Sequence, residues 1–213
     1  MSDVRFGLPG MDFQPGDHVC AMYMGTRQRD EFLLPFLRSG LIAGDKCLCV
    51  VDSSDPRATV DALRGSLRGI DVEDCLAAGQ LEVIGSTGTY LSTGAFVKQD
   101  VLDFWERDLG QRLATGRYQF ARAAGEMPEG LRTLPGGIET FMEYEAELNL
   151  FTKRHPQQVL ICMYDLDLFG GGIILDLLRT HPRLLLGGLV LDNPHFQPPA
   201  RLAATDPQPL PRI

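Results

Sequence analysis

Short apolar runs alternate with amphipathic stretches along most of this chain. His18–Tyr23 and Lys46–Val51 are mainly apolar throughout, and such continuous apolar character is typical of parallel strands that are covered on both faces. Residues 26–43 carry apolar side chains at helical spacing and are followed by Gly44, a typical end of a helix. The same patterns predict further strands at residues 81–84, 119–124, 159–164 and within 184–191, and further helices from Pro56 and over 98–115, 138–154 and 170–180.

The alternation of strands with helices favours right-handed crossover connections and a parallel sheet. We therefore expect an α/β fold of three layers, with a mostly parallel central sheet and helices on both faces. The chain has 213 residues, which is within the usual range for one domain. Residues 200–213 are rich in Pro and Ala, and we expect this C-terminal tail to be loose or to lie along the surface.

The charge and the cysteines of the chain bear on its partners and its compartment. The formal net charge is −8 and no run of Lys or Arg is present, so we expect no direct binding to nucleic acid. We find no apolar stretch of the length of a membrane span and no apolar signal core at the start, so we expect no membrane association. Five cysteines occur without CxxC spacing, and we interpret them as buried thiols in a reducing compartment, the cytoplasm.

The end of the first predicted strand lacks the loop that holds a triphosphate. In a parallel sheet, ligands bind beyond the carboxyl ends of the strands, and a phosphate-binding loop there requires GxxxxGK[ST]. The segment YMGTRQRD at residues 23–30 has one glycine and no lysine. Arg27 or Arg29 remains as a weak candidate for holding an anion at the start of the helix. We therefore expect no NTPase activity, no cofactor and no catalytic residue.

Several segments, in their order along the chain, resemble a known family. They are GDHVC at 16–20, PFLRSGLIAGDKCLCVV at 35–51, GEM at 125–127, YEAELN at 144–149, CMYD at 162–165, THP at 180–182 and NP at 193–194. Together they resemble the MEDS domain, the sensory domain named for the dichloromethane-responsive repressor DcmR, over residues 12–199. The resemblance implies a divergent RecA/KaiC-like P-loop fold without a working P-loop.

The resemblance also implies a role. Members of the family are thought to sense small molecules, hydrocarbon derivatives in the founding cases, and to signal to attached DNA-binding or histidine-kinase modules. We recognise no such module in this chain, so we expect output through a separate protein, such as a transcription factor or a histidine kinase. We expect a single sensory domain over residues 12–199, and we leave open whether it forms a homo-oligomer.

A ligand pocket is expected at the carboxyl ends of the strands. Its predicted lining combines polar groups near the predicted strand ends with residues of the resembling segments. The ten candidates are His18, Tyr23, Arg27, Glu126, Met127, Glu145, Tyr164, Asp165, His181 and Asn193. Tyrosines would supply apolar faces with a polar tip, and the methionine would supply a side chain that adapts to apolar ligands.

Several of these candidates have a purely structural alternative. His18 can be a hydrogen-bonded core histidine, and His181 can cap the helix over 170–180. Asp165 stands where a magnesium-organising aspartate would stand, yet it can simply end a strand. Glu126 can pair with an arginine, such as Arg122, instead of a ligand.

The helix over 138–154 carries two pairs of polar residues spaced four positions apart. Glu143 and Glu147 are predicted to form an exposed acidic face, because like charges at this spacing repel unless they are solvated or paired. Glu145 and Asn149 face another direction and are candidates for pointing inward.

A metal site from His18, Cys20 and Cys162 would require neighbouring strands to align these side chains on one face of the sheet. We expect no metal site.

Three functions are compatible with these features. The first is a sensory module that binds a small, mainly apolar molecule. The second is a non-standard nucleotide-binding protein in which Arg27 or Arg29 replaces the missing lysine. The third is a protein-interaction scaffold whose pocket is closed.

Overall fold

The fold is described by a computed structural model for residues 11–52, 56–66 and 69–199. The tail expected over residues 200–213 lies outside these ranges. The strands are β1 (His18–Tyr23), β2 (Lys46–Val51), β3 (Leu81–Gly85), β4 (Ala121–Glu126), β5 (Gln158–Asp165), β6 (Arg183–Leu186) and β7 (Leu189–Asp192). The helices are α1 (Gly25–Ala43), α2 (Pro56–Ser66), α3 (Val72–Ala77), α4 (Lys98–Trp105), α5 (Gln111–Ala114), α6 (Gly137–Arg154), α7 (Leu166–Phe169) and α8 (Ile174–Thr180).

The strands form one seven-stranded sheet in the order β3-β2-β4-β5-β1-β6-β7. Neighbours are parallel except for β6 and β7, an antiparallel hairpin in which Leu186 pairs with Leu189. The two residues between them, Gly187 and Gly188, both have positive φ (55° and 82°), as two-residue hairpin turns commonly require. The prediction of a mostly parallel sheet is confirmed.

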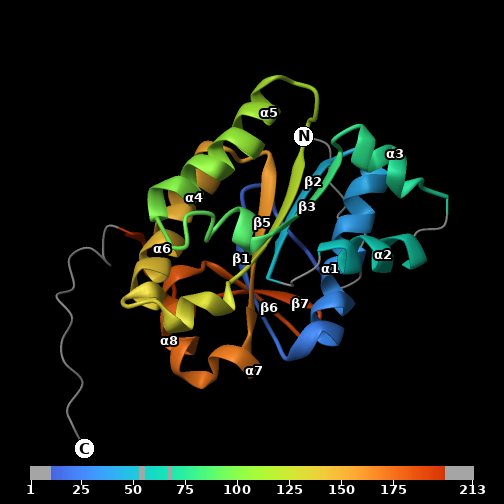
Figure 1. The fold of residues 1–213 in the computed structure, drawn as a ribbon. Helices are drawn as coiled ribbons and strands as arrows, with labels where there is room; N and C mark the ends of the chain where they lie inside the picture. The colour runs from blue at the N-terminus through green and yellow to red at the C-terminus, as the bar shows by residue number, and fades with distance from the viewer. Residues whose placement is uncertain (1–10, 53–55, 67–68, 200–213) are drawn as a thin grey trace, which may run out of the picture.

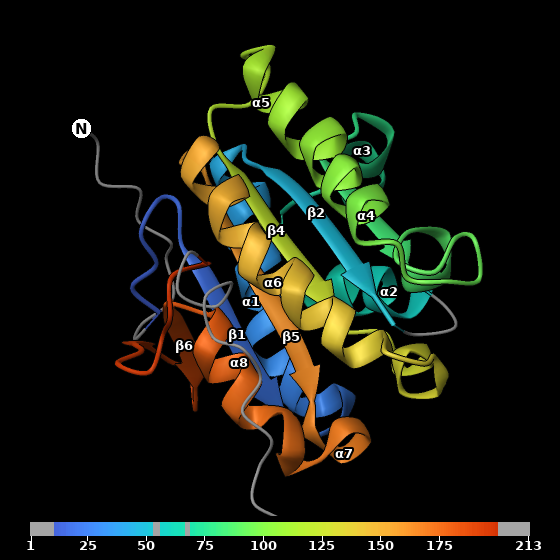
Figure 2. The same ribbon diagram turned by 90° about the vertical axis from the view of Figure 1, so that its left-hand side faces the viewer.

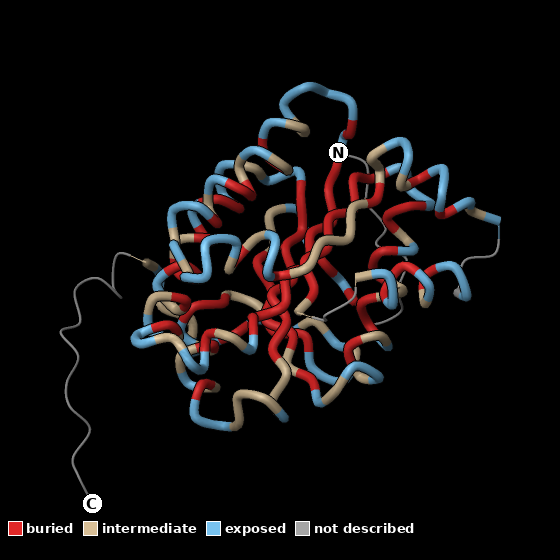
Figure 3. The backbone as a smooth tube through the Cα atoms, in the orientation of Figure 1, coloured by how far each residue is buried: buried red, intermediate tan, exposed pale blue. Residues whose placement is uncertain are grey.

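Helices cover both faces of this sheet (Figure 1). α1, α2 and α3 lie on one face, and α4, α5, α6 and α8 lie on the other, as the view turned by 90° also shows (Figure 2). Side chains of the central strands alternate between two apolar clusters, one under each helical layer. The central strands β1, β2, β4 and β5 are consequently the most deeply buried part of the described chain (Figure 3). The predicted three-layer α/β architecture is confirmed.

Some helical segments differ from the sequence prediction. α7 was not predicted, and α8 begins at Ile174 and not at residue 170. α3 was not predicted either, because six residues span fewer than two helical turns; its start is stabilised by Asp71, whose side chain accepts hydrogen bonds from the backbone of Glu73 and Asp74. The helix expected over 98–115 is divided into α4 and α5 by a π-helical turn at Glu106–Gly110. None of these differences changes the order of the layers.

Close packing of α1 on the sheet depends on Gly40. A Cβ atom at this position would lie 2.5 Å from Cδ of Arg122 and 2.7 Å from Sγ of Cys47. The guanidinium of Arg122 is fully buried there and donates hydrogen bonds to Asp45 Oδ2 (2.8 Å) and to the carbonyl of Phe36 (3.2 Å). A glycine in the last turn of α1 therefore makes room for a buried ion pair.

Candidate functional site

Glu126, the last residue of β4, is the centre of a polar network at the carboxyl edge of the sheet. Its Oε1 accepts a hydrogen bond of 2.5 Å from the hydroxyl of Tyr23 at the end of β1. Arg29 of α1 donates to both carboxylate oxygens at 3.2 and 3.3 Å. The backbone N–H of Asp52, which follows β2, donates to Oε2 at 2.6 Å. Three strands and a helix therefore converge on one buried carboxylate.

Glu126 pairs with an arginine, as the sequence suggested, but the partner is Arg29 and not the example given, Arg122. The side chains of Glu126 and Arg122 project from the same face of β4, but four residues separate them, and a strand rises about 3.3 Å per residue. Arg122 therefore lies far back along β4, where it pairs with Asp45 at 2.8 Å. Arg29 reaches Glu126 instead, because the first turns of α1 lie over the carboxyl ends of the strands.

The side chain of Asp165, the last residue of β5, binds the backbone at the start of α1. Its Oδ1 accepts hydrogen bonds from the backbone N–H of Gly25 (3.2 Å) and of Asp167 (3.0 Å). Only Met24 separates β1 from α1, so no loop is present that could wrap a phosphate chain. A helix N-terminus attracts anions, and here the anion is a carboxylate of the chain itself.

One cavity at this edge, of about 490 Å³, lies beside Tyr23 and Arg27. Another, beside Glu126 and Asp165, has a volume of about 120 Å³, whereas sites for drug-sized ligands span roughly 300–1,000 Å³. It is lined by Tyr23, Thr26, Arg29, Asp52, Glu126, Met127, Glu129, Asp165 and Leu168. Burial, together with the negative charge of Glu126, raises the pKa of Tyr23, so its hydroxyl remains a hydrogen-bond donor. Burial also raises the pKa of Asp52.

A second polar cluster lies inside the molecule, under α6. His18 of β1, Glu145 of α6, Cys162 of β5 and His181 after α8 are all buried, and one ligand atom from each lies within 4.8 Å of every other. β1 and β5 are paired neighbours with Cys20 opposite Cys162, so these strands present alternate side chains toward α6. We name this set the His–Glu–Cys–His cluster.

Hydrogen bonds hold each member of the cluster in place. Oε2 of Glu145 lies 3.2 Å from Nε2 of His18 and 3.2 Å from Nε2 of His181. Sγ of Cys162 lies 3.2 Å from Nε2 of His18. The hydroxyl of Tyr164 lies 3.1 Å from Nε2 of His181. Two imidazoles therefore meet at the single oxygen Oε2, and Cys162 and Tyr164 each contact one of these imidazoles.

The ionisation of the cluster is shifted by its environment. For Glu145, burial acts to raise the pKa, but hydrogen bonds and charge from His18 and His181 outweigh it and lower the pKa to about 2. For His18, burial and the neighbouring His181 lower the pKa below its ordinary value. Glu145 is therefore held as a carboxylate in a site that has no lysine or arginine among its described ion-pair partners.

The ten residues predicted from the sequence fall into two groups. Tyr23, Glu126, Met127 and Asp165 line the small edge cavity, and His18, Glu145, Tyr164 and His181 belong to the inner cluster or touch it. Asn193 supports the inner group, since its Nδ2 donates to the carbonyls of Leu178 (2.6 Å) and His181 (2.7 Å). Arg27 is exposed and pairs with Glu31 at 2.7 Å.

Some contributing residues were not predicted as site residues. Arg29 was considered only as an anion ligand, and Cys162 only as part of a metal site with Cys20. Asp52 was not considered, because an aspartate after a strand is common. Asn149 was expected to point inward, and it does, together with Glu145; their exposed fractions are 3% and 1%. The spacing of four residues was the signal for that pair.

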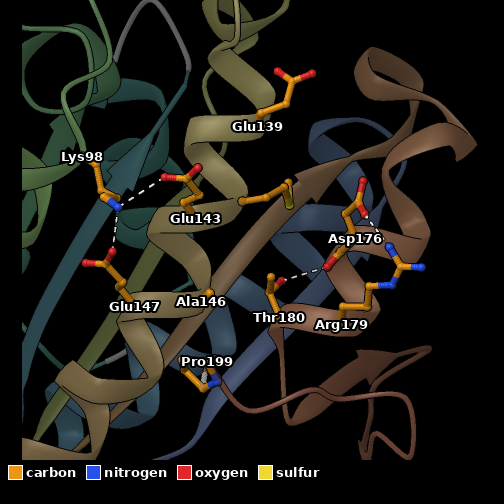
Figure 4. Close-up of a pocket in the computed structure, with 10 residues that line it drawn as sticks. Lys98, Glu139, Glu143, Ala146, Glu147, Asp176, Arg179, Thr180 and Pro199 are labelled. Atoms are coloured by element: carbon orange, nitrogen blue, oxygen red, sulfur yellow. Dashed lines mark hydrogen bonds and ion pairs between the residues drawn. The ribbon is translucent and has the colours of Figure 1, made fainter. Parts of the chain in front are cut away.

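A larger pocket opens between α6 and α8, beside the inner cluster (Figure 4). Its volume is about 590 Å³. Met142 and Ala146 of α6 and Thr180 of α8 contribute to its wall, and charged side chains stand around it. Ala146 and Thr180 are the immediate chain neighbours of Glu145 and His181. This pocket was not predicted, because its two helices come together only in the folded chain.

A comparison with known protein families identifies the family of this chain. The family described as MEDS, MEthanogen/methylotroph, DcmR Sensory domain, matches residues 17–182. This chain belongs to the MEDS family. The matched range includes both polar clusters, from His18 to His181. The resemblance inferred from the sequence motifs is confirmed.

A relative of known function lies within the same family. The transcriptional repressor DcmR of Methylorubrum extorquens is 28% identical over 174 residues, which cover 82% of this MEDS chain and 61% of the repressor. The chain therefore matches about three fifths of the length of that relative. The family description and this relative support a regulatory, sensory role.

A solved structure supports the fold assignment. The flagellar accessory protein FlaH from Methanocaldococcus jannaschii superimposes with a TM-score of 0.50 and 10% identity, over 88% of this chain and 79% of FlaH. The likeness confirms the RecA-like fold. Within residues 11–52, 56–66 and 69–199, no helix is long and apolar enough to cross a membrane.

Proposed function

We propose that this MEDS chain is a cytoplasmic sensory module that binds a small, mainly apolar molecule and signals to a separate transcription factor or histidine kinase. One observation carries the proposal. Where a fold of this kind binds nucleotides, the network around Glu126 and Asp165 leaves a cavity of only about 120 Å³, while a pocket of about 590 Å³ lies between α6 and α8. The five described cysteines are free and buried, which supports a reducing compartment.

The pocket between α6 and α8 has the properties of a small-molecule site. Its volume is in the range that such sites occupy. Its lining carries two cations and four carboxylates: Lys98 pairs with Glu147 (2.6 Å) and Glu143 (3.3 Å), Arg179 pairs with Asp176 (3.3 Å), and Glu139 is the fourth acid (Figure 4). The apolar wall at Met142 and Ala146 would contact an apolar ligand.

A route for the signal leads from this pocket into the sheet. Thr180 lines the pocket, and its Oγ1 lies 2.9 Å from Nδ1 of His181. Asn149 of α6 donates to the carbonyl of Thr180 at 2.8 Å and faces His18 of β1 at 3.1 Å. Suppose that α8 can adopt two placements relative to α6. A ligand that binds the protein more tightly in one placement than in the other would shift these contacts, and only such a difference in affinity can transmit a signal.

Thermal unfolding in the presence of a small-molecule library tests the proposal. We expect at least one class of largely apolar compounds to raise the unfolding temperature of the wild-type chain. Met142→Trp should abolish this shift by filling the pocket. Leu150→Trp, on the same helix but outside the pocket, should retain it. The proposal fails if no compound stabilises the wild type, or if both variants respond equally.

A nucleotide-binding function is the second candidate, and the geometry opposes it. Arg29 is already paired with Glu126 and Asp30, and four carboxylates line the cavity where phosphates would lie, those of Asp52, Glu126, Glu129 and Asp165. We expect calorimetry to detect no binding of Mg-ATP at millimolar concentration. A measurable heat of binding that disappears in Arg29→Met would favour this candidate over the sensory one.

A further inference from the structure

The donor atoms of the His–Glu–Cys–His cluster are of the types that bind transition metals. Two imidazole nitrogens, one carboxylate oxygen and one cysteine sulfur lie within 4.8 Å of one another. These are ligands typical of zinc, for which bond lengths are about 2.0–2.3 Å and the geometry is tetrahedral. Such a tetrahedron places its ligand atoms about 3.3–3.7 Å apart. The three closest separations in the cluster are each 3.2 Å.

The hydrogen bonds of Asn149 determine which nitrogen of His18 carries a proton. Nδ2 of Asn149 donates to the carbonyls of Thr180 (2.8 Å) and Ala146 (3.1 Å), so its Oδ1 is the atom that faces His18. Oδ1 lies 3.1 Å from Nδ1 of His18 and can only accept a hydrogen bond. Nδ1 therefore carries a proton, and in the neutral ring Nε2 presents a lone pair toward Glu145 and Cys162.

His181 is held in the same way from the other side. Its Nδ1 lies 2.9 Å from the backbone carbonyl of Leu177, which can only accept a hydrogen bond. Nδ1 is again the protonated nitrogen, and Nε2 presents a lone pair to Oε2 of Glu145. The predicted capping of α8 by His181 is confirmed by this contact. Metal-binding histidines commonly donate the second ring N–H to a carbonyl or amide in this manner.

Three acceptors thus face one another in a dry interior. The lone pairs of two Nε2 atoms and the carboxylate oxygen of Glu145 point toward one another, and the exposed fractions of His18, Glu145 and His181 are 1% or less. The thiol of Cys162 and the hydroxyl of Tyr164 are the donors that contact these nitrogens, and loss of the thiol proton leaves a set of lone pairs that a cation can fill. We propose that His18, Glu145, Cys162 and His181 bind one divalent transition-metal ion of the zinc type.

The charges of this site balance. Binding releases the thiol proton of Cys162 to solvent and forms a metal–thiolate bond, with no change of oxidation state. The thiolate and the carboxylate of Glu145 then carry two negative charges, which neutralise a divalent cation. A site without net charge avoids the large penalty for burying an ion. A single proton shared between the histidines and Glu145 is the rival occupant.

The completeness of the ligand set indicates what the metal would do. Four protein ligands fill a tetrahedron and leave no position for water, as in structural rather than catalytic zinc sites. The ligands come from β1, α6, β5 and the residue that follows α8, so the metal would join the sheet to the two helices that border the large pocket. It would stabilise the arrangement of α6 and α8 on which the proposed ligand pocket depends.

Cobalt(II) substitution tests the site, because this ion reports its own coordination in the absorption spectrum. The whole chain is unfolded in the presence of a chelator, desalted and refolded with CoCl₂, since the site is buried. We expect one equivalent of cobalt per chain, intense visible d–d bands typical of tetrahedral coordination, and a near-ultraviolet sulfur-to-cobalt charge-transfer band. We also expect zinc to raise the unfolding temperature of the metal-free protein.

Variants of the cluster distinguish a bound metal ion from a shared proton as its occupant. Cys162→Ser is nearly isosteric and should lose the charge-transfer band, while His181→Gln should lower cobalt affinity by more than about tenfold. His155→Gln removes a histidine that pairs with Glu106 outside the cluster and should match the wild type. Refolded wild-type protein with a native circular dichroism spectrum but no cobalt bands would overturn the proposal, as would a Cys162→Ser spectrum identical to that of the wild type. Neither result depends on finding the small-molecule ligand.

Discussion

The hydroxyl of Tyr23 donates a hydrogen bond of 2.5 Å to Oε1 of Glu126, and this contact joins β1 to β4 across the intervening strand β5. Arg29 and the backbone of Asp52 complete the coordination of the same carboxylate. Ligands bind at this edge in folds of this kind, and here Glu126 is held there by hydrogen bonds within the protein. The contribution of each contact to the free energy of unfolding can be measured separately.

Tyr23→Phe removes one hydrogen bond to a buried carboxylate without changing the shape of the side chain. Hydrogen bonds to charged groups contribute roughly 1.5–3 kcal/mol, so we expect the free energy of unfolding in urea to fall by about 2 kcal/mol. Tyr118→Phe is the matched control. Its hydroxyl makes only a 3.4 Å contact with the carbonyl of Ala78, and the loss should be below about 1 kcal/mol. Equal losses in the two variants would contradict the special role of Tyr23.

Arg29→Met leaves the charge of Glu126 without its cation. Removing one partner of a buried ion pair costs roughly 3–5 kcal/mol, and the side chains of Arg29 and Glu126 are only 5% and 9% exposed. We expect a loss of about 3 kcal/mol in urea unfolding. Adding Glu126→Gln should recover part of it, because the uncompensated charge is gone. Arg27→Met, which removes an exposed pair with Glu31, should change stability by less than about 1 kcal/mol.

Gly40→Ala places a methyl group against Arg122 and Cys47. The new Cβ would lie 2.5 Å from Arg122 Cδ, so α1 or the buried guanidinium must move, and overpacking of this kind costs roughly 1–3 kcal/mol. Gly65→Ala in α2 is the control, because nothing lies within 4 Å of its added Cβ. That variant should be neutral or more stable by up to about 1 kcal/mol. Thermal or urea unfolding of the pair decides whether Gly40 is a packing requirement.

Lys46→Met should change how stability depends on alkaline pH. The ammonium of Lys46 is buried and donates to Gly79 O (2.8 Å) and Glu82 Oε1 (2.7 Å). Burial lowers its pKa below 10.5, although Glu82 opposes the shift. Between the lowered pKa and 10.5 the unfolded chain binds more protons than the folded chain, so folding stability contributed by this residue rises with pH.

The difference in unfolding free energy between wild type and Lys46→Met should therefore move in favour of the wild type as the pH rises toward 10.5. Glu82 keeps a partner in the variant, because Arg112 also contacts it at 3.0 Å. Urea unfolding of both proteins over a series of pH values measures the difference. A difference that is constant or moves the other way would show that Lys46 is not perturbed by burial.

Much of the fold could be predicted because its signals are local. The apolar runs of β1 and β2 and the left-handed glycine at the end of α1 each lie within a few residues, and the structure has them where they were expected. The inward direction of Glu145 and Asn149 also followed from helical spacing alone. Where the helix spans fewer than two turns, as in α3, the prediction failed.

The site was harder to predict, because its contacts depend on geometry between distant segments. Glu126 and Arg29 are 97 positions apart. Neither segment shows how α1 is rotated about its axis, and this rotation decides which arginine of α1 lies over the strand ends. The wrong choice of Arg122 came from proximity in sequence. Cys162 and His18 meet because β1 and β5 are neighbours in the sheet, a pairing that skips three intervening strands in chain order.

The sequence by itself determined that this is an α/β chain with alternating strands and helices, that it lacks the residues of a phosphate-binding loop, and that its motifs are those of the MEDS family. Those properties reside in short segments, where backbone preference and apolar spacing act locally. Tertiary structure alone decided that Glu126 is sealed by Tyr23 and Arg29, and that two histidines, a glutamate and a cysteine share one buried point. The physical reason is that strand order and helix rotation set which side chains meet, and both are settled only when the whole core packs.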